Sequence, residues 1–116
     1  MRPSPSDPVA PAAREVVPLQ QWDGFLGSRS LGAKIRSACE TILERGSILV
    51  LDWGGIEVVS QSFADELVGK LVLMLGEEEF RRRIRFAGVS ESVRPVLRYA
   101  IASRLDRVAE PTSQAM

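Results

Sequence analysis

The chain has 116 residues, and its 15 Lys and Arg side chains balance 15 Asp and Glu, so the formal net charge is zero. That length suits one domain with its own hydrophobic core, and the balanced charge excludes a general attraction to nucleic acid or an anionic membrane. With no histidine and one cysteine, the chain cannot form a disulfide framework, a Cys/His zinc site, a Ser-His-Asp triad or a Cys-His pair. We therefore expect no metal, no cofactor and no enzymatic activity.

No apolar run approaches the ~20 residues that a membrane span requires, and the N-terminus lacks the pattern of a signal peptide. The lone cysteine fits a reducing compartment. These features together predict a cytoplasmic protein.

The ends of the chain differ in composition from its middle. Residues 1–13, MRPSPSDPVAPAA, contain four prolines among small residues and are predicted to be a disordered tail. Residues 14–108 carry the periodic apolar pattern of a folded domain, and residues 109–116 are expected to fray.

The first elements of the domain are a strand and a helix. Arg14–Gln20 is a candidate strand, and Pro18 places it at the edge of a sheet because proline lacks a backbone donor. Phe25 and Leu26 could add a short extended piece. Ser28 or Ser30 can cap a helix that ends at Gly46. Its apolar stripe consists of Leu31, Ile35, Ala38, Cys39, Ile42 and Leu43, which predicts that the thiol is buried and inert.

The run Ile48–Leu51 predicts the central strand, closed by Asp52 and the pair Gly54-Gly55. An unbroken aliphatic run of this length is typical of a strand buried on both faces. The following crossing, Trp53–Val59, is too apolar for a free loop and is expected to lie against the core.

The next helix is predicted from about Gln61 to Leu75, with Gly76 after it. Ser60 and Ser62 lie at its start, where backbone N–H groups lack intrahelical partners and can receive an anion such as a phosphate. Ser62 and Asp65 also have capping-box spacing, in which the hydroxyl serves only the helix. The sequence leaves both interpretations open.

The stretch EEEFRRRIR, Glu77 to Arg85, has acids before bases at the spacing that stabilises a helical turn, with Phe80 as its anchor to the core. The cluster Arg81, Arg82, Arg83 and Arg85 is either a solvated face or an anion site. Ile84–Val89 predicts the last strand.

A final helix is expected to start near Val93. Ser90 or Ser92 is the cap, and Pro95 favours Ser92 because proline fits only the first turn. Its buried face would be Val93, Val96, Leu97, Ala100, Ile101 and Leu105, and its solvated side would be Arg94, Arg98, Arg104 and Arg107.

The order is therefore strand, helix, strand, helix, strand, helix. Such alternation predicts a small α/β sandwich, a three- to four-stranded sheet with right-handed crossovers and helices packed on it.

The segment VLDWGGIEVVSQSFADEL, residues 50–67, resembles the STAS-like bacterial domains of unknown function, as do SRSLGAKIR before it and IRFAGVSESVRPVLRYAI after it. These domains are similar to the STAS fold of anti-sigma-factor antagonists. The resemblance implies a serine at a helix start that a histidine-kinase-like ATPase phosphorylates, which switches partner binding off. By position, Ser62 matches that serine and Asp52 the acid that ends the preceding strand. The sequence departs from the antagonist pattern at residues 60–63, and Asp65 and Glu66 would oppose a phosphate.

We hypothesise a non-catalytic regulatory module that binds a protein partner. The candidate binding or regulatory residues are Ser60, Ser62, Asp52, Asp65 and Arg29. Arg29 gains nothing from the dipole at a helix start, so it is either a surface contact or bonded to a loop carbonyl. The alternatives are an interaction module without phosphorylation and a sensor of a small ligand or nucleotide that uses the arginine cluster.

Overall fold

The structure is a computed structural model that describes residues 13–22 and 25–114, with side chains described for residues 13–22 and 26–106. Its elements are β1 (Arg14–Pro18), η1 (Leu19–Gln21), β2 (Phe25–Leu26), α1 (Arg29–Glu44), β3 (Ile48–Asp52), β4 (Val58–Val59), α2 (Gln61–Ala64), η2 (Asp65–Gly69), α3 (Lys70–Arg83), β5 (Ile84–Ala87) and α4 (Arg94–Gln114). Residues 1–12, which the sequence assigns to a disordered tail, lie outside the described residues. None of the helices described is long and apolar enough to cross a membrane.

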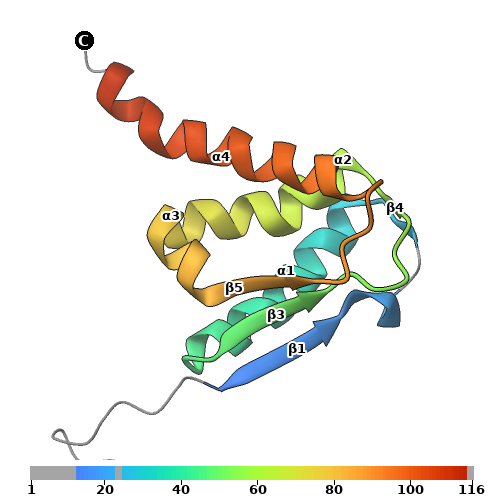
Figure 1. Ribbon diagram of the computed structural model, residues 1–116. Coiled ribbons are helices and arrows are strands. Elements are labelled where there is room, and N and C mark those ends of the chain that lie inside the picture. The colour runs from blue at the N-terminus through green and yellow to red at the C-terminus, as the bar shows by residue number, and fades with distance from the viewer. Residues whose placement is uncertain (1–12, 23–24, 115–116) are drawn as a thin grey trace, which may run out of the picture.

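The main sheet is parallel and three-stranded, with β3 at its centre and β1 and β5 at its edges (Figure 1). The predicted α/β alternation and the edge position of β1 are confirmed. Ala13, assigned to the tail, accepts a hydrogen bond from the Ile48 amide at 2.7 Å and so belongs to the ladder. The predicted extended piece at Phe25–Leu26 pairs in parallel with β4 as a separate small sheet.

The helices cover one face of the main sheet only. Leu49 and Leu51 are fully buried, whereas Ile48 and Val50 are half-buried. In the register, Val50 lies between Val16, which is 58% exposed, and the exposed Arg85. The prediction of a strand buried on both faces is therefore wrong, because alternate residues point to opposite faces and no helix among the described residues covers the second face.

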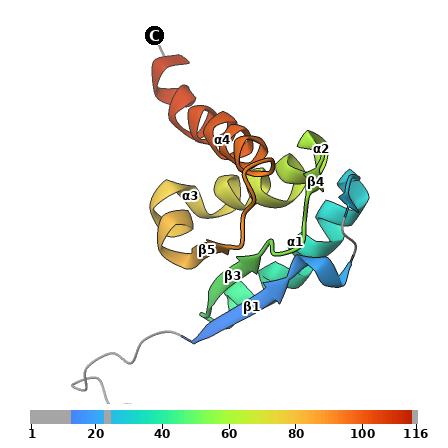
Figure 2. The same ribbon diagram turned by 45° about the vertical axis from the view of Figure 1, so that its right-hand side comes forward.

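Three long helical segments pack on the covered face. α1 and α3 contact the strands, whereas α4 lies across α2, η2 and α3, as Figures 1 and 2 show. The crossing between β3 and α2 lies against the core as predicted, with Trp53, Ile56 and Val59 buried. Cys39 is also fully buried, and burial raises its pKa to about 12.

The second helix ends at Gly76 as predicted, but it is less regular than its sequence indicates. Residues 65–69 form one π-helical turn, and Gly76 breaks the helix with a φ of 82° that few residues other than glycine adopt. Helical structure resumes at Glu77 and continues to Arg83. Phe80 is buried in this last part, as expected of its anchor.

The start of α4 corrects one prediction. Ser90, not Ser92, serves the helix start, because its hydroxyl accepts from the Val93 amide at 3.3 Å. The Ser92 hydroxyl instead donates to the Glu57 carbonyl. The helix extends to Gln114.

Candidate functional site

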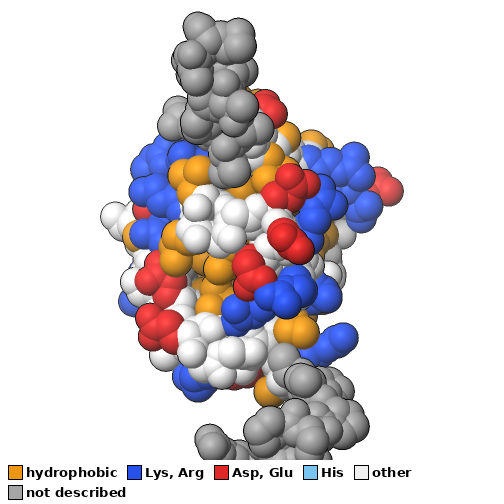
Figure 3. All heavy atoms as spheres, turned by 90° about the vertical axis from the view of Figure 1, so that its left-hand side faces the viewer, with side chains coloured by type: hydrophobic (Ala, Val, Ile, Leu, Met, Phe, Trp, Pro, Cys, Tyr) orange, Lys and Arg blue, Asp and Glu red, His pale blue; other side chains and the backbone are white. Residues whose placement is uncertain are grey.

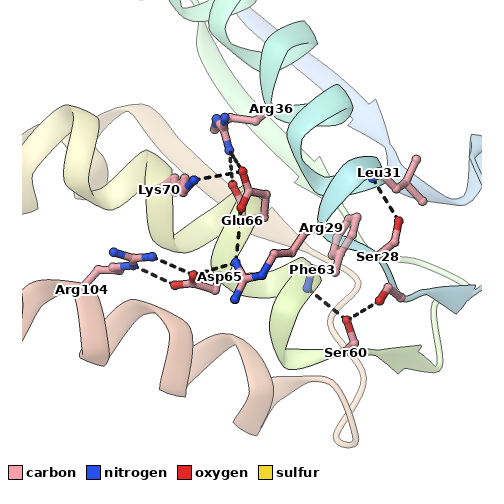
Figure 4. A network of polar contacts seen from close by, with 11 residues as sticks. Ser28, Arg29, Leu31, Arg36, Ser60, Phe63, Asp65, Glu66, Lys70 and Arg104 are labelled. Carbon is pink, nitrogen blue, oxygen red and sulfur yellow. Dashed lines mark hydrogen bonds and ion pairs between the residues drawn. The ribbon is translucent and has the colours of Figure 1, made fainter.

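Ser60 caps the helix that follows β4. Its hydroxyl oxygen accepts from the Phe63 amide at 3.0 Å and donates to the Gly27 carbonyl at 2.9 Å (Figure 4). One side chain thus fixes the helix start and holds it against the loop before α1. The predicted capping box of Ser62 and Asp65 is wrong, because the helix begins two residues earlier than that arrangement requires.

Ser62 is the second residue of α2, and it is exposed. Within the described residues, no protein group bonds to its hydroxyl. It lines a hollow of about 300 Å³, here called the Ser62 hollow, between the starts of α1 and α2 and the middle of α4. The other lining residues are Arg29, Gln61, Asp65, Tyr99, Ala100, Ser103 and Arg104.

Asp65 lies at the base of this hollow. Arg104 donates two hydrogen bonds of 2.7 Å to its carboxylate, and Arg29 adds a third of 3.3 Å. The bond from Arg104 is the main reason that the Asp65 pKa lies below its usual range. The sequence places Arg104 on the solvated side of the last helix, but its side chain is only 15% exposed and ties α4 to the second helix.

Glu66 is a buried charge, 7% exposed. Its carboxylate accepts from Arg36 at 2.9 Å, Lys70 at 3.1 Å and Arg29 at 3.3 Å. These bonds, above all the one from Arg36, lower its pKa to about 2, so the side chain is charged at neutral pH. Arg36 also donates to the Glu66 carbonyl at 2.5 Å, inside the π turn, where the change of hydrogen-bonding register interrupts the regular ladder.

Two glycines let the helices around this network approach closely. A Cβ atom on Gly32 would lie 3.0 Å from the Glu66 Cβ and 3.2 Å from the Phe63 carbonyl oxygen. A Cβ atom on Gly69 would lie 2.7 Å from an Asp65 carboxylate oxygen. The charged network therefore sits where α1, η2 and α4 are in close contact.

The network has four cations and three anions: Arg29, Arg36, Lys70 and Arg104 against Glu40, Asp65 and Glu66. Figure 4 shows these residues except Glu40. The network therefore has an excess of one positive charge. Arg29 binds carboxylates, which corrects the predicted bond to a loop carbonyl. Its side chain remains 57% exposed.

Asp52 is not part of this site. It ends β3 as predicted, but its carboxylate accepts from the Gly54 amide at 2.9 Å, and it does not line the Ser62 hollow. It stabilises the turn after the strand. Among the predicted residues, the structure brings together Arg29, Ser60, Ser62 and Asp65, and leaves Asp52 apart.

The arginines near the end of α3 are engaged locally. Arg81, Arg82 and Arg83 pair with glutamates one turn earlier, and Arg83 and Arg85 also donate to backbone carbonyls. The face that carries the end of α3 and the start of β5 shows basic and acidic side chains interspersed around apolar ones (Figure 3). This arrangement favours the solvated-face interpretation over an anion site.

The sequence reasoning missed the roles of Arg36, Glu66, Lys70 and Tyr99. The spacing of Glu66 and Lys70 predicts an ion pair on one helix, and Glu66 falls three residues after the buried Phe63, on the side of the core. The spacing of Arg36 and Glu40 also predicts an ion pair on one helix. No local signal links Arg36 to Glu66, because the two residues are 30 positions apart. In the described residues, no group of three His, Cys, Asp or Glu is placed to hold a metal ion.

These features define a class: a small α/β domain with a parallel three-stranded sheet and a serine-capped second helix. The family model for the STAS-like domain of unknown function (DUF4325) matches residues 32–94, and the chain belongs to this family. The match includes Ser60, Ser62 and the three acids of the network, whereas Arg29, Tyr99 and Arg104 lie outside it. Neither the curated proteins nor the solved structures contain a significant match to the chain.

Proposed function

We propose that this domain is a non-catalytic regulatory module that binds a protein partner through the face around Ser62, and that phosphorylation of Ser62 switches this binding off. The partner expected from the family resemblance is a histidine-kinase-like ATPase. The face consists of Gln61 and Ser62 at the start of α2 and Tyr99 and Ser103 on α4. Tyr99 is 63% exposed, and tyrosine is one of the residues that anchor protein interfaces.

The observation that carries the proposal is that Ser60 and Ser62 have different roles at the helix start. Ser60 forms both hydrogen bonds that the helix start needs, so Ser62 is not required for the cap. Its exposed hydroxyl is accessible to a kinase. A modification there would change the surface without removing a structural bond.

The charged network supports a phosphate at this position. In the sequence alone, Asp65 and Glu66 oppose a phosphate at Ser62. In the structure both acids are paired, and the network around them has one positive charge in excess. A phosphoserine carries about −1.5 to −2 charges, and the first turn of a helix adds unpaired amides.

Phosphorylation would also act on the link between helices. Arg29 and Arg104 line the Ser62 hollow and hold Asp65. A phosphate on Ser62 would compete with Asp65 for these guanidinium groups, because charge-assisted bonds to phosphate are among the strongest in proteins. The competition would alter both the charge of the face and the contact of α4 with the second helix.

The test uses the tagged full chain expressed in its native host. Wild type, Ser62→Ala and Ser62→Asp are compared for co-purified protein by quantitative mass spectrometry, with Ser37→Asp on the exposed side of α1 as the matched control. We expect wild type, Ser62→Ala and Ser37→Asp to retain the same partner and Ser62→Asp to lose it. The same spectra report phosphate on Ser62.

Two outcomes would contradict the proposal in different ways. If a partner binds Ser62→Asp as tightly as it binds wild type, the domain is an interaction module that phosphorylation of Ser62 does not switch. Recovery of no specific protein by any of the four chains would contradict the partner-binding function itself.

A further inference from the structure

A second hollow, of about 500 Å³, lies where the chain passes from the end of β5 to the first turns of α4. We call it the β5–α4 hollow. Its apolar lining is Phe86, Val89, Leu97 and Ile101, and its basic lining is Arg94 and Arg98. These residues occupy a different flank of α4 from Tyr99 and Ser103, which line the Ser62 hollow.

The apolar part of the β5–α4 hollow is accessible. Leu97 is buried, but Phe86, Val89 and Ile101 are only half-buried, although all three pack against the core. The free energy falls when another apolar group covers side chains that are half-buried in this way. The hollow is therefore suited to receive one or two large apolar side chains.

The walls of this hollow are held in place by backbone packing. β5 ends at Ala87, and Gly88 follows with a φ of 70°. A Cβ atom on Gly88 would lie 2.8 Å from the Gly54 amide nitrogen, so the loops after β3 and β5 touch. The hollow thus sits at the carboxyl edge of the parallel sheet.

Arg94 and Arg98 give the hollow its charge. They are one helical turn apart, exposed, and shared with an adjoining hollow of about 360 Å³ that Glu91 and Pro95 also line. Most other arginines of the fold are bound to carboxylates, but among the described side chains neither of these two forms an ion pair. They also stand in the first turns of α4, where the helix dipole already disfavours positive charge.

We propose that the β5–α4 hollow is a docking site for an acidic segment of a partner protein, which places a large apolar side chain among Phe86, Val89 and Ile101 and carboxylates against Arg94 and Arg98. Charge complementarity selects this occupant, since two unpaired cations flank an apolar lining. Helical peptides dock in grooves through apolar anchors at intervals of one turn, and acids at the same interval would match the two arginines. The site shares no lining residue with the Ser62 hollow, so it does not depend on the proposed switch.

The experiment is a selection of random peptides displayed on phage against the intact chain. The selected peptides are then tested for binding to the Arg94→Glu/Arg98→Glu variant. We expect the selected peptides to share a large apolar residue flanked by Asp or Glu. A synthetic peptide of that sequence should bind wild type and lose affinity by about tenfold or more in the double variant.

Three comparisons make the result specific. Arg81→Glu/Arg82→Glu changes two other exposed arginines and should leave the dissociation constant within about twofold of wild type. Val89→Ser, which adds no charge, tests the apolar part independently and should weaken the peptide. Amide shifts in NMR spectra should be confined to residues 86–89 and 94–101, and circular dichroism checks that each variant is folded.

The proposal would be overturned if the selected peptides shared no common sequence or were apolar without acids. It would also be overturned if a selected peptide bound the Arg94→Glu/Arg98→Glu variant as tightly as wild type. Ser62→Asp should not change the affinity of the peptide. Loss of the peptide in that variant would mean that the two hollows form one site, which would also contradict the inference.

Discussion

One guanidinium nitrogen of Arg36, Nη1, donates to both the side chain and the backbone of Glu66, at 2.9 Å to Oε2 and 2.5 Å to the carbonyl oxygen. The two residues are 30 positions apart, so this contact joins α1 to the π turn of the second helix. The same turn lies beside the helix start that carries Ser62. The structure of the candidate site therefore depends on a tertiary ion pair.

Replacing Arg36 by Met should destabilise the fold strongly. Glu66 would lose its shortest ion pair and remain buried, and its carbonyl would lose a donor. Removing one partner of such a pair is expected to lower the free energy of unfolding by about 2–4 kcal/mol. Urea denaturation measures the change, and Arg81→Met, at an exposed pair, should change it by less than about 1 kcal/mol. Equal losses in both variants would contradict the assigned role of Arg36.

The stability of the fold should fall in acid because of Glu66. Its pKa is about 2 in the folded chain and 4.5 ordinarily, so the folded state binds the proton less well. This contribution is complete above pH 4.5 and is lost as the pH falls toward 2.

The corresponding measurement is urea denaturation of wild type and Glu66→Gln across this pH range. The difference in free energy of unfolding between them should shrink as the pH falls. Asp65 and Glu15, whose pKa values are also lowered, remain in both chains and serve as the common background. A constant difference across the range would show that Glu66 does not titrate in this way.

Ser60→Ala and Ser62→Ala should differ in stability. Ser60→Ala removes the hydroxyl that accepts from Phe63 and donates to Gly27, and the loss of a cap costs about 1 kcal/mol. Ser62→Ala should change the free energy of unfolding by less than about 0.5 kcal/mol, because its side chain is exposed. Thermal denaturation of the two variants and wild type gives the comparison. The reverse order would assign the cap to Ser62 and would remove the basis of the proposed switch.

Gly32→Ala should destabilise the fold although alanine is the better helix former. In an exposed helix the change would gain about 1 kcal/mol. Here the new methyl group would press on the Cβ of Glu66 and the carbonyl of Phe63, and such overpacking costs about 1–3 kcal/mol. Ser37→Ala on the exposed side of α1 is the control and should be neutral or slightly stabilising. A more stable Gly32→Ala chain would mean that α1 and η2 are farther apart than described.

Most of the fold could be predicted from local patterns. The alternation of apolar runs predicts the order of strands and helices. Gly46 and Gly76 mark helix ends correctly, since both adopt the positive φ that few other residues tolerate. The apolar crossing after Asp52 also lies against the core as its composition predicts. These features follow from interactions between residues that are near one another in the chain.

The sequence by itself determined the fold class, the buried cysteine and the position of a helix whose N-terminus carries serine residues. It did not determine which serine caps that helix, which face of β3 is open, or which acids and bases are paired. Those features depend on contacts such as Arg36 with Glu66, Arg104 with Asp65 and Ser60 with Gly27, each between residues at least 30 positions apart. Only the tertiary structure decided them, because the energy of a buried charge or a cap depends on groups that no local pattern of residues contains.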